Sequence, residues 1–71
     1  MKNTSIEILR SAGFTLEEAK NELRAGTQIW TDPADMANEW GTTVDAIRSF
    51  REPDLMITEY EGKEYGIQIV H

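Results

Sequence analysis

The sequence predicts a single small α+β domain that is mainly helical, with a C-terminal two-stranded β-hairpin and a short strand near 28–31. Its 71 residues suffice for one compact domain. Helix-capping residues precede each apolar segment up to residue 50, and glycines follow most of these segments. Beyond residue 55 the apolar residues alternate, which is typical of strands buried on one face.

A short helix is expected at the N-terminus. Thr4 and Glu7 have the spacing of a capping box, in which the threonine accepts from a free amide and the glutamate reaches back. Ile6 and Leu9 would form the buried face of this helix, and Gly13 would end it. The sequence leaves open whether the helix packs on the domain or contacts a second copy of the chain.

The same capping signal recurs at Thr15 and Glu18, and Gly26 suits a left-handed helix end. A second helix is therefore expected between them. Phe14, just before it, is expected to fill the core. The buried residues of the second helix would be Leu16, Ala19 and Leu23.

The segment 27–31 is β-prone and is expected to form a brief strand. Asp32 then suits the N-cap of a third helix, and Pro33 suits its first position, where no amide is needed. This helix should run to about Trp40 and break at Gly41.

A fourth helix should follow, capped by either Thr42 or Thr43, and it should finish before Pro53. Its apolar residues are Val44, Ile47 and Phe50.

The segments 55–60 and 65–70 have the alternation of a β-hairpin, with a turn centred on Glu61–Gly62 or on Gly62–Lys63. Both turns put the same side chains on one face, because the two registers differ by an even step. That face is expected to cover the helices, and it would comprise Met56, Thr58, Tyr60, Tyr65, Ile67 and Ile69.

Ala37, Gly41 and Ile47 have a specific spacing within the third and fourth helices. Where two helices cross closely, the first needs a small residue, and the turn needs a glycine able to take a positive φ. The second helix needs an apolar residue that packs back. The remaining buried bulk would come from Met36, Trp40 and Phe50.

Together with the order of the elements, this spacing resembles the winged helix-turn-helix superfamily. Residues 15–71 would form the winged helix-turn-helix domain, with the hairpin as its wing, and residues 1–14 would be an N-terminal helical extension. The resemblance implies DNA binding through the helix 43–51, in a transcription regulator of the kind found in phages and plasmids. Such a regulator would act as a homodimer on a half-site repeat.

The resemblance also implies roles for individual residues. Arg48 would make a bidentate contact to guanine, and Thr43 would contact a phosphate or a thymine methyl group. Lys63 would be the phosphate contact of the wing. A local ion pair of Arg48 or Arg51 with Asp45 or Glu52 is an equally good expectation. The full DNA-binding set is Thr43, Val44, Asp45, Arg48, Ser49, Arg51 and Lys63.

The charge of the chain favours a different function. Thirteen acidic residues stand against seven basic ones, for a net charge of −6. Proteins that bind DNA usually have a basic face, because phosphate neutralisation supplies much of their affinity. Here Asp45 projects where phosphates would approach, and Thr42 stands where the superfamily usually has an apolar residue.

The alternative is therefore a small acidic inhibitor of phage type, which binds a basic nucleic-acid-handling protein. It would be similar in size and charge to anti-CRISPR and anti-restriction proteins that mimic DNA. A third possibility is an accessory subunit that docks through the hairpin, whose tyrosines are either core or a protein-binding patch. The protein-binding residues would be Glu59, Tyr60, Glu61, Glu64 and Tyr65.

We do not expect an enzyme, a cofactor or a metal site. The chain has no cysteine and no phosphate-binding loop, and His71 is the last residue. No apolar run is long enough to cross a membrane, and the N-terminus lacks the pattern of a signal peptide. We therefore expect a soluble cytoplasmic protein with no membrane partner.

Overall fold

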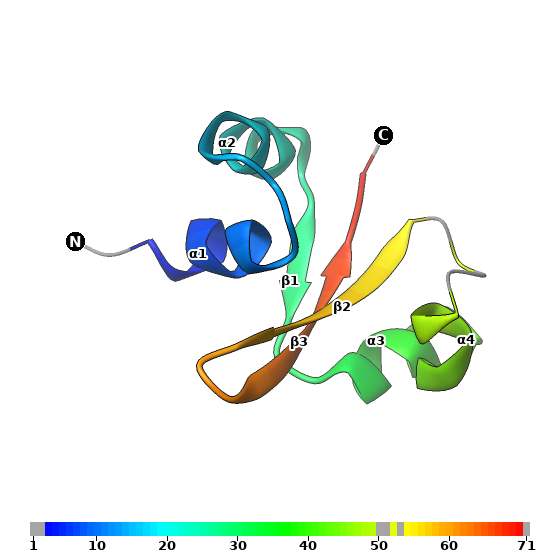
Figure 1. Cartoon of the computed structure of the whole chain (residues 1–71). Coiled ribbons are helices and arrows are strands. Elements are labelled where there is room, and N and C mark those ends of the chain that lie inside the picture. Colours follow the sequence, from blue (N-terminus) through cyan, green and yellow to red (C-terminus); the bar gives the residue numbers. More distant parts are fainter. Residues whose placement is uncertain (1–2, 50–51, 53, 71) are drawn as a thin grey trace.

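The computed structural model describes residues 3–49, 52 and 54–70. Within them the chain forms four helices and a three-stranded antiparallel sheet, which confirms the α+β class. The strand order is β1-β3-β2, so the last strand lies in the centre. In chain order (Figure 1) the elements are α1 (Thr4–Ser11), α2 (Leu16–Ala25), β1 (Gln28–Trp30), α3 (Pro33–Glu39), α4 (Val44–Arg48), β2 (Leu55–Tyr60) and β3 (Lys63–Gln68).

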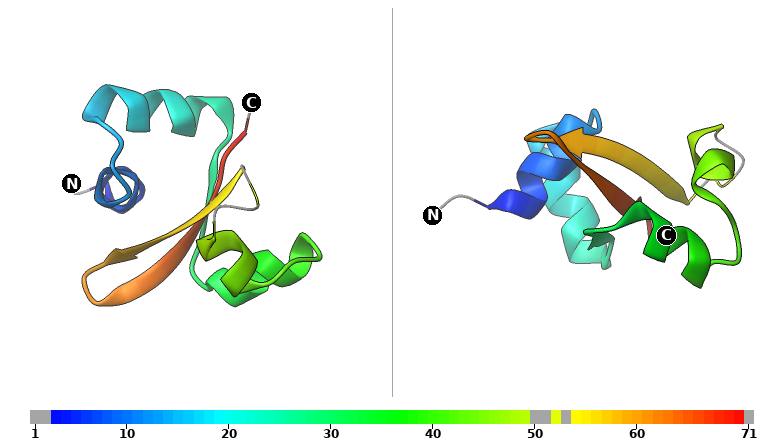
Figure 2. Two further views of the ribbon diagram at one scale, coloured as in Figure 1. Left: turned by 45° about the vertical axis from the view of Figure 1, so that its right-hand side comes forward. Right: turned by 90° about the horizontal axis from the view of Figure 1, so that it is seen from below.

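The sheet lies between two pairs of helices. Figure 1 and the left view of Figure 2 show α1 and α2 on one face of the sheet, with α3 and α4 on the other. Each face has its own core. In the first, Ile67 of β3 packs with Ile8, Leu9 and Ala19, and in the second the buried residues are Met36, Ala37, Ile47 and Leu55.

The hairpin face predicted from the alternation is confirmed. Tyr65 and Ile67 belong to the first core, together with Met56 and Tyr60 of β2. The expectation that this face covers all the helices is wrong, however. The intervening side chains Leu55 and Ile57 are also apolar, so the opposite face is buried as well, beneath α3 and α4.

The N-terminal segment contributes directly to the core. Ile8 and Leu9 of α1 are 3% and 0% exposed, and α1 packs against both α2 and β2. The N-cap of α1 is Asn3, whose Oδ1 accepts from the Ile6 amide at 3.2 Å, and not Thr4 as predicted. Thr4 is instead the first residue of the helix.

The ends of α2 match their prediction. The amide of Thr15 donates to Glu18 Oε1 at 2.9 Å, and the amide of Glu18 donates to Thr15 Oγ1 at 3.1 Å. Gly26 ends the helix with a φ of 103°. Leu16, expected in the core, is 44% exposed at the first position of α2, and the fully buried residue of this helix is Ala19 one turn later.

The hairpin turn is centred on Glu61–Gly62, which settles the alternative left open by the sequence. Both residues have a positive φ, 51° and 78°, as a type I′ turn requires. Tyr60 therefore pairs with Lys63, and Thr58 pairs with Tyr65. The two tyrosines are diagonal neighbours, with ring centroids 6.4 Å apart.

Gly66 lies at the centre of the sheet, between Trp30 of β1 and Ile57 of β2. Met36 of α3 crosses directly over it. A Cβ atom on residue 66 would come within 2.8 Å of both Met36 Sδ and Met36 Cε. The absence of a side chain here lets α3 approach the sheet closely.

We predict that Gly66→Val destabilises the protein by about 1–3 kcal/mol, although valine favours strands, because it overpacks the second core. Met36→Ala alone should cost about 2–5 kcal/mol through the cavity it leaves. In the double variant the valine occupies that cavity, so the combined loss should be smaller than the sum. Urea unfolding of the four proteins measures this coupling, and strictly additive losses would contradict the packing described.

Candidate functional site

The predicted helix-turn-helix segment forms a closely packed helix pair. Asp32 caps α3 and Pro33 opens it, as expected. Ala37 and Ile47 are each 2% exposed in the second core, and Gly41 has a φ of 67° in the turn between the helices. The amide of Thr42 donates to the carbonyl of Ala37 at 2.9 Å, which closes the end of α3.

Helix α4 is shorter than the predicted segment 43–51. Its N-cap is Thr43, whose Oγ1 accepts from the Ala46 amide at 3.1 Å, and its C-cap is Ser49. The hydroxyl of Ser49 donates to the carbonyl of Asp45 at 2.9 Å. Phe50 and Arg51, to which the sequence assigned core and DNA-binding roles, lie outside the described residues.

Val44 does not project outward as the DNA-binding prediction required. It is half-buried and packs against the second core beside Ile47. The first turn of α4 faces the sheet at this position, so the outward residues of the described helix are Asp45 and Arg48.

The predicted guanine contact, Arg48, is already engaged. Its Nη2 atom forms an ion pair with Oε2 of Glu64 on β3, and each side chain is 46% exposed. The sequence had suggested Asp45 or Glu52 as the local partner. Glu64 takes that place because α4 lies across the same face of the hairpin on which Glu64 projects.

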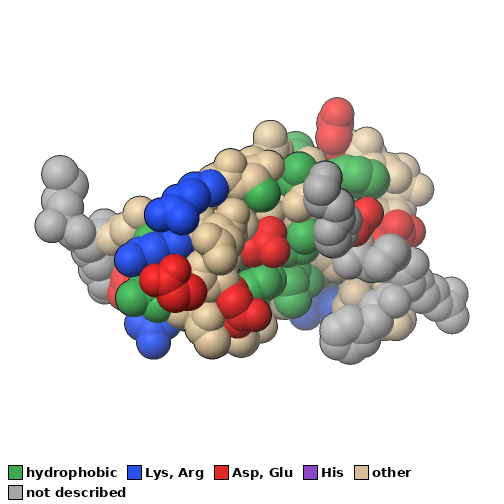
Figure 3. All heavy atoms as spheres, turned by 90° about the horizontal axis from the view of Figure 1, so that it is seen from above, with side chains coloured by type: hydrophobic (Ala, Val, Ile, Leu, Met, Phe, Trp, Pro, Cys, Tyr) green, Lys and Arg blue, Asp and Glu red, His purple; other side chains and the backbone are tan. Residues whose placement is uncertain are grey.

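The surface of the helix pair is acidic. Between residues 32 and 49 the sequence has four acidic residues and a single basic residue, Arg48. All four acidic side chains are exposed: Asp32, Asp35, Glu39 and Asp45. Figure 3 views the opposite side, over α1 and α2, where acidic side chains are scattered and most of the visible lysine and arginine side chains lie toward the end where the chain begins.

The hairpin residues proposed for protein binding do not form one surface. Tyr60 and Tyr65 are half-buried against α1 and α2, whereas Glu59 and Glu64 alternate onto the opposite face. The Nζ atom of Lys63, the predicted phosphate contact of the wing, lies 5.3 Å from the ring centroid of Tyr65. Glu61 is exposed in the turn itself.

Two tryptophans share one hydrogen-bond acceptor. The indole nitrogens of Trp30 and Trp40 both donate to Oε1 of Gln68, at 3.1 and 3.0 Å. The sequence placed the ring of Trp40 in the core, but Trp40 is 48% exposed. As the C-cap of α3, Trp40 reaches back over the sheet to Gln68 and remains open to solvent on its other side.

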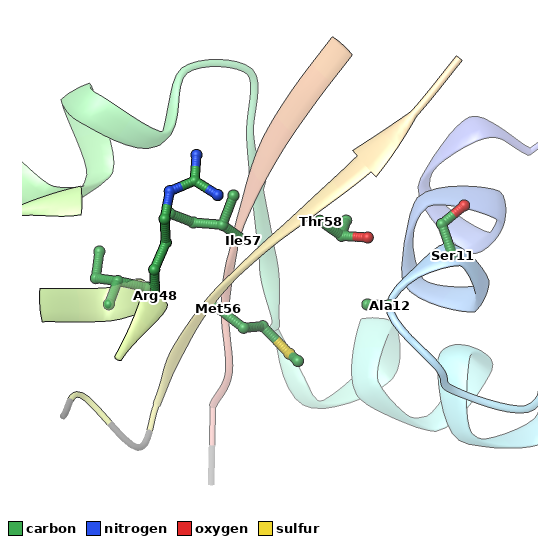
Figure 4. A pocket seen from close by; sticks show the side chains of 7 residues that line it. Ser11, Ala12, Arg48, Met56, Ile57 and Thr58 are labelled. Atoms are coloured by element: carbon green, nitrogen blue, oxygen red, sulfur yellow. The ribbon is translucent and has the colours of Figure 1, made fainter. Parts of the chain in front are cut away.

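A cavity of about 390 Å³ lies beside β2, and no pattern in the sequence predicts it. Figure 4 shows α4 on one side of β2 and the end of α1 on the other. A second hollow of about 350 Å³ adjoins it through Ser11 and is lined by Glu7, Arg10 and Tyr60. The residues that line the first cavity are Ser11, Ala12, Ile47, Arg48, Met56, Ile57 and Thr58.

These lining residues come from α4 and β2, which follow one another in the chain, and from the end of α1, which is distant in sequence. No single sequence motif contains them all. The sequence shows the alternation of apolar residues in β2, but this alternation does not predict which edge of the strand lacks a neighbouring strand.

No family model, curated protein or solved structure matches the chain. Among the described residues no helix is long and apolar enough to span a membrane. Nor does that part of the chain contain a cluster of three or more histidine or acidic side chains suited to a metal ion.

We predict that Gln68→Met destabilises the protein by about 1–2 kcal/mol, because the half-buried indole of Trp30 loses its acceptor. The matched control is Gln28→Met, at the exposed position paired with Gln68 across the sheet. Urea unfolding and the tryptophan emission maximum measure the effect. Equal stability of the two variants would show that the shared acceptor does not fix the indoles.

Proposed function

We propose that this protein acts by binding a basic protein partner. The observation that carries the proposal is the charge of the α3–α4 pair, where the one cation in a predominantly acidic segment is engaged by Glu64. A surface of this kind repels phosphates and attracts lysine- and arginine-rich proteins.

Charge over the whole chain supports the same function. At a net charge of −6, the protein and the phosphates of a nucleic acid would repel each other. The described residues of the helix pair form no basic patch that could offset this repulsion. A basic protein would instead be steered toward the acidic surface, with an association rate that falls as salt screens the charges. This matches the small acidic inhibitor considered above, which would occupy a nucleic-acid-handling protein in place of DNA.

We expect a fluorescent decalysine peptide to bind at about 50 mM salt and to dissociate largely at about 200 mM, while a short random-sequence duplex does not bind at either. The double variant Glu39→Gln/Asp45→Asn should weaken peptide binding by about threefold or more. Fluorescence anisotropy measures both.

The matched control is Glu17→Gln/Glu22→Gln, which removes the same charge from α2. Glu17 and Asp45 both lie in the first turn of a helix, and Glu22 and Glu39 lie toward helix ends. Glu22 accepts from the Thr27 hydroxyl at 3.0 Å, and glutamine keeps an oxygen that can accept the same bond. Equal losses for the two double variants would mean that only net charge matters. Salt-dependent binding of the duplex would overturn the proposal.

A second candidate function is that of a DNA-binding regulator of the winged helix-turn-helix type. What favours it is the order of elements from α2 onward, with the sheet order β1-β3-β2 and the glycine turn between α3 and α4. The separation of α2 from the α3–α4 pair by the sheet weighs against it, since the three helices of that domain pack together.

If the protein is a regulator of this type, Arg48 must break its ion pair with Glu64 to reach a base. Arg48→Ala should then relax sequence choice at one base position, at a cost of about 1–3 kcal/mol. Selection of binding sites from a random duplex pool tests this, with Lys63→Ala as the control that should weaken all sequences alike. An unchanged preference would remove Arg48 from base recognition.

A further inference from the structure

We propose that the outer edge of β2 receives an extended basic segment of the partner protein as a fourth strand of the sheet. This inference rests on the proposed protein-binding function and assigns it a site. Strand addition of this kind takes its affinity from main-chain hydrogen bonds and its specificity from alternate side chains.

The first observation is the free edge itself. The strand order β1-β3-β2 leaves β2 with one neighbour among the described strands. Tyr60 and Lys63 flank a two-residue turn, so the hydrogen-bonded pairs with β3 fall at Tyr60, Thr58 and Met56. The peptide groups of Ile57 and Glu59 therefore point away from the sheet.

At the start of the strand the edge is closed. The amide of Leu55 donates to the carbonyl of Glu52 at 3.2 Å, but the backbone hydrogen bonds found outside the helices and strands of the described chain include none at Ile57 or Glu59. The open part of the edge thus begins at Ile57, which lines the cavity, and continues to Glu59.

The second observation is the shape of the cavity. Ser11 and Ala12 at the end of α1 border it on one side, and Arg48 of α4 borders it on the other (Figure 4). Ile47 of α4 also lines it. Its floor is β2. Because neighbouring strands lie about 4.8 Å apart, a strand added to β2 would run through this cavity between the two helices. Its volume of about 390 Å³ suits a short stretch of peptide.

The helices at the edge favour a peptide over a second copy of this chain. Pairing of β2 with β2 of another copy would bring that copy's own α1 and α4 against the same two borders. An isolated extended segment brings no helices with it, so it can enter between them.

The third observation is the charge around the edge. Between residues 52 and 64 the sequence has five acidic residues and one basic residue, and Glu59 is exposed at the open part of the strand. On the α1 side the cavity wall is apolar at Ala12 and Met56, and on the α4 side Glu59 projects from the same face of β2 as Ile57. Because alternate side chains of a strand point to opposite faces, the complementary occupant is a segment in which basic residues alternate with apolar ones of moderate size. Its apolar side chains would enter the cavity on the α1 side, and its cations would approach Glu59 on the α4 side.

The probe is a capped peptide that alternates lysine and valine over six positions, titrated into the intact protein and followed by amide NMR and hydrogen exchange. We expect saturable binding, with slowed exchange of the Ile57 and Glu59 amides. A peptide of the same sequence with N-methyl groups on alternate residues, which cannot donate to the edge, should bind about tenfold more weakly or worse.

Two variants test the site in the protein. Glu59→Pro removes an outward amide at a position where an edge strand tolerates proline, and it should reduce affinity at least about tenfold. Leu16→Pro is the matched control, because it places proline at the exposed first position of α2 and should bind normally. Ser11→Trp fills the cavity from an exposed position and should also block binding, which provides a test independent of the folding of Glu59→Pro.

The outcomes separate this inference from the proposed function. Binding with shifts confined to Asp35, Glu39 and Asp45 would overturn the β2 site and keep the proposed function. No binding of this peptide or of decalysine would overturn both. Dimerisation of the protein alone, measured by light scattering and abolished by Glu59→Pro, would show that a second copy occupies the edge. It would overturn the inference that a segment of a partner protein binds there.

Discussion

The architecture depends on the close approach of α3 to the central strand at Gly66. Met36 of α3 occupies the space that a side chain at this position would fill. The approach allows the second face of the sheet to be buried by two helices of only seven and five residues. A chain of 71 residues thereby obtains two small cores on one sheet, where a single-sided arrangement would leave Leu55 and Ile57 in solvent.

Polar contacts also connect the two ends of the α3–α4 pair to that face of the sheet. Gln68 accepts from the indoles of Trp30 and Trp40 at one end, and Arg48 of α4 pairs with Glu64 at the other. Exposed ion pairs contribute little to stability, so the main effect of the Arg48–Glu64 pair is on the charge of the surface. It neutralises the only cation of the helix pair and leaves an acidic surface, which is the basis of the proposed affinity for basic proteins.

The same layering produces the open edge of β2. Because β1 and β2 both pair with β3, neither pairs with a further strand of the described chain, and the helices on the two faces border the edge of β2 without covering it. An unprotected strand edge invites pairing with another chain. In this molecule the proposed affinity would come from main-chain hydrogen bonds to the edge of β2. The bordering helices and the nearby glutamates would select which chain can pair with it.

The sequence by itself determined the features that depend on a few neighbouring residues. The capping box of Thr15 and Glu18, the proline start of α3 and the alternation of the hairpin were predicted, because each is set by local backbone preference. Asn3 was missed as a cap because Thr4 next to it has equally suitable chemistry. The tertiary structure alone decided which elements meet: that both sheet faces are covered, that Trp40 stays exposed, that Arg48 meets Glu64, and that a cavity lies beside β2. These depend on packing between residues far apart in the chain, and periodicity specifies which side chains share a face but not what covers it.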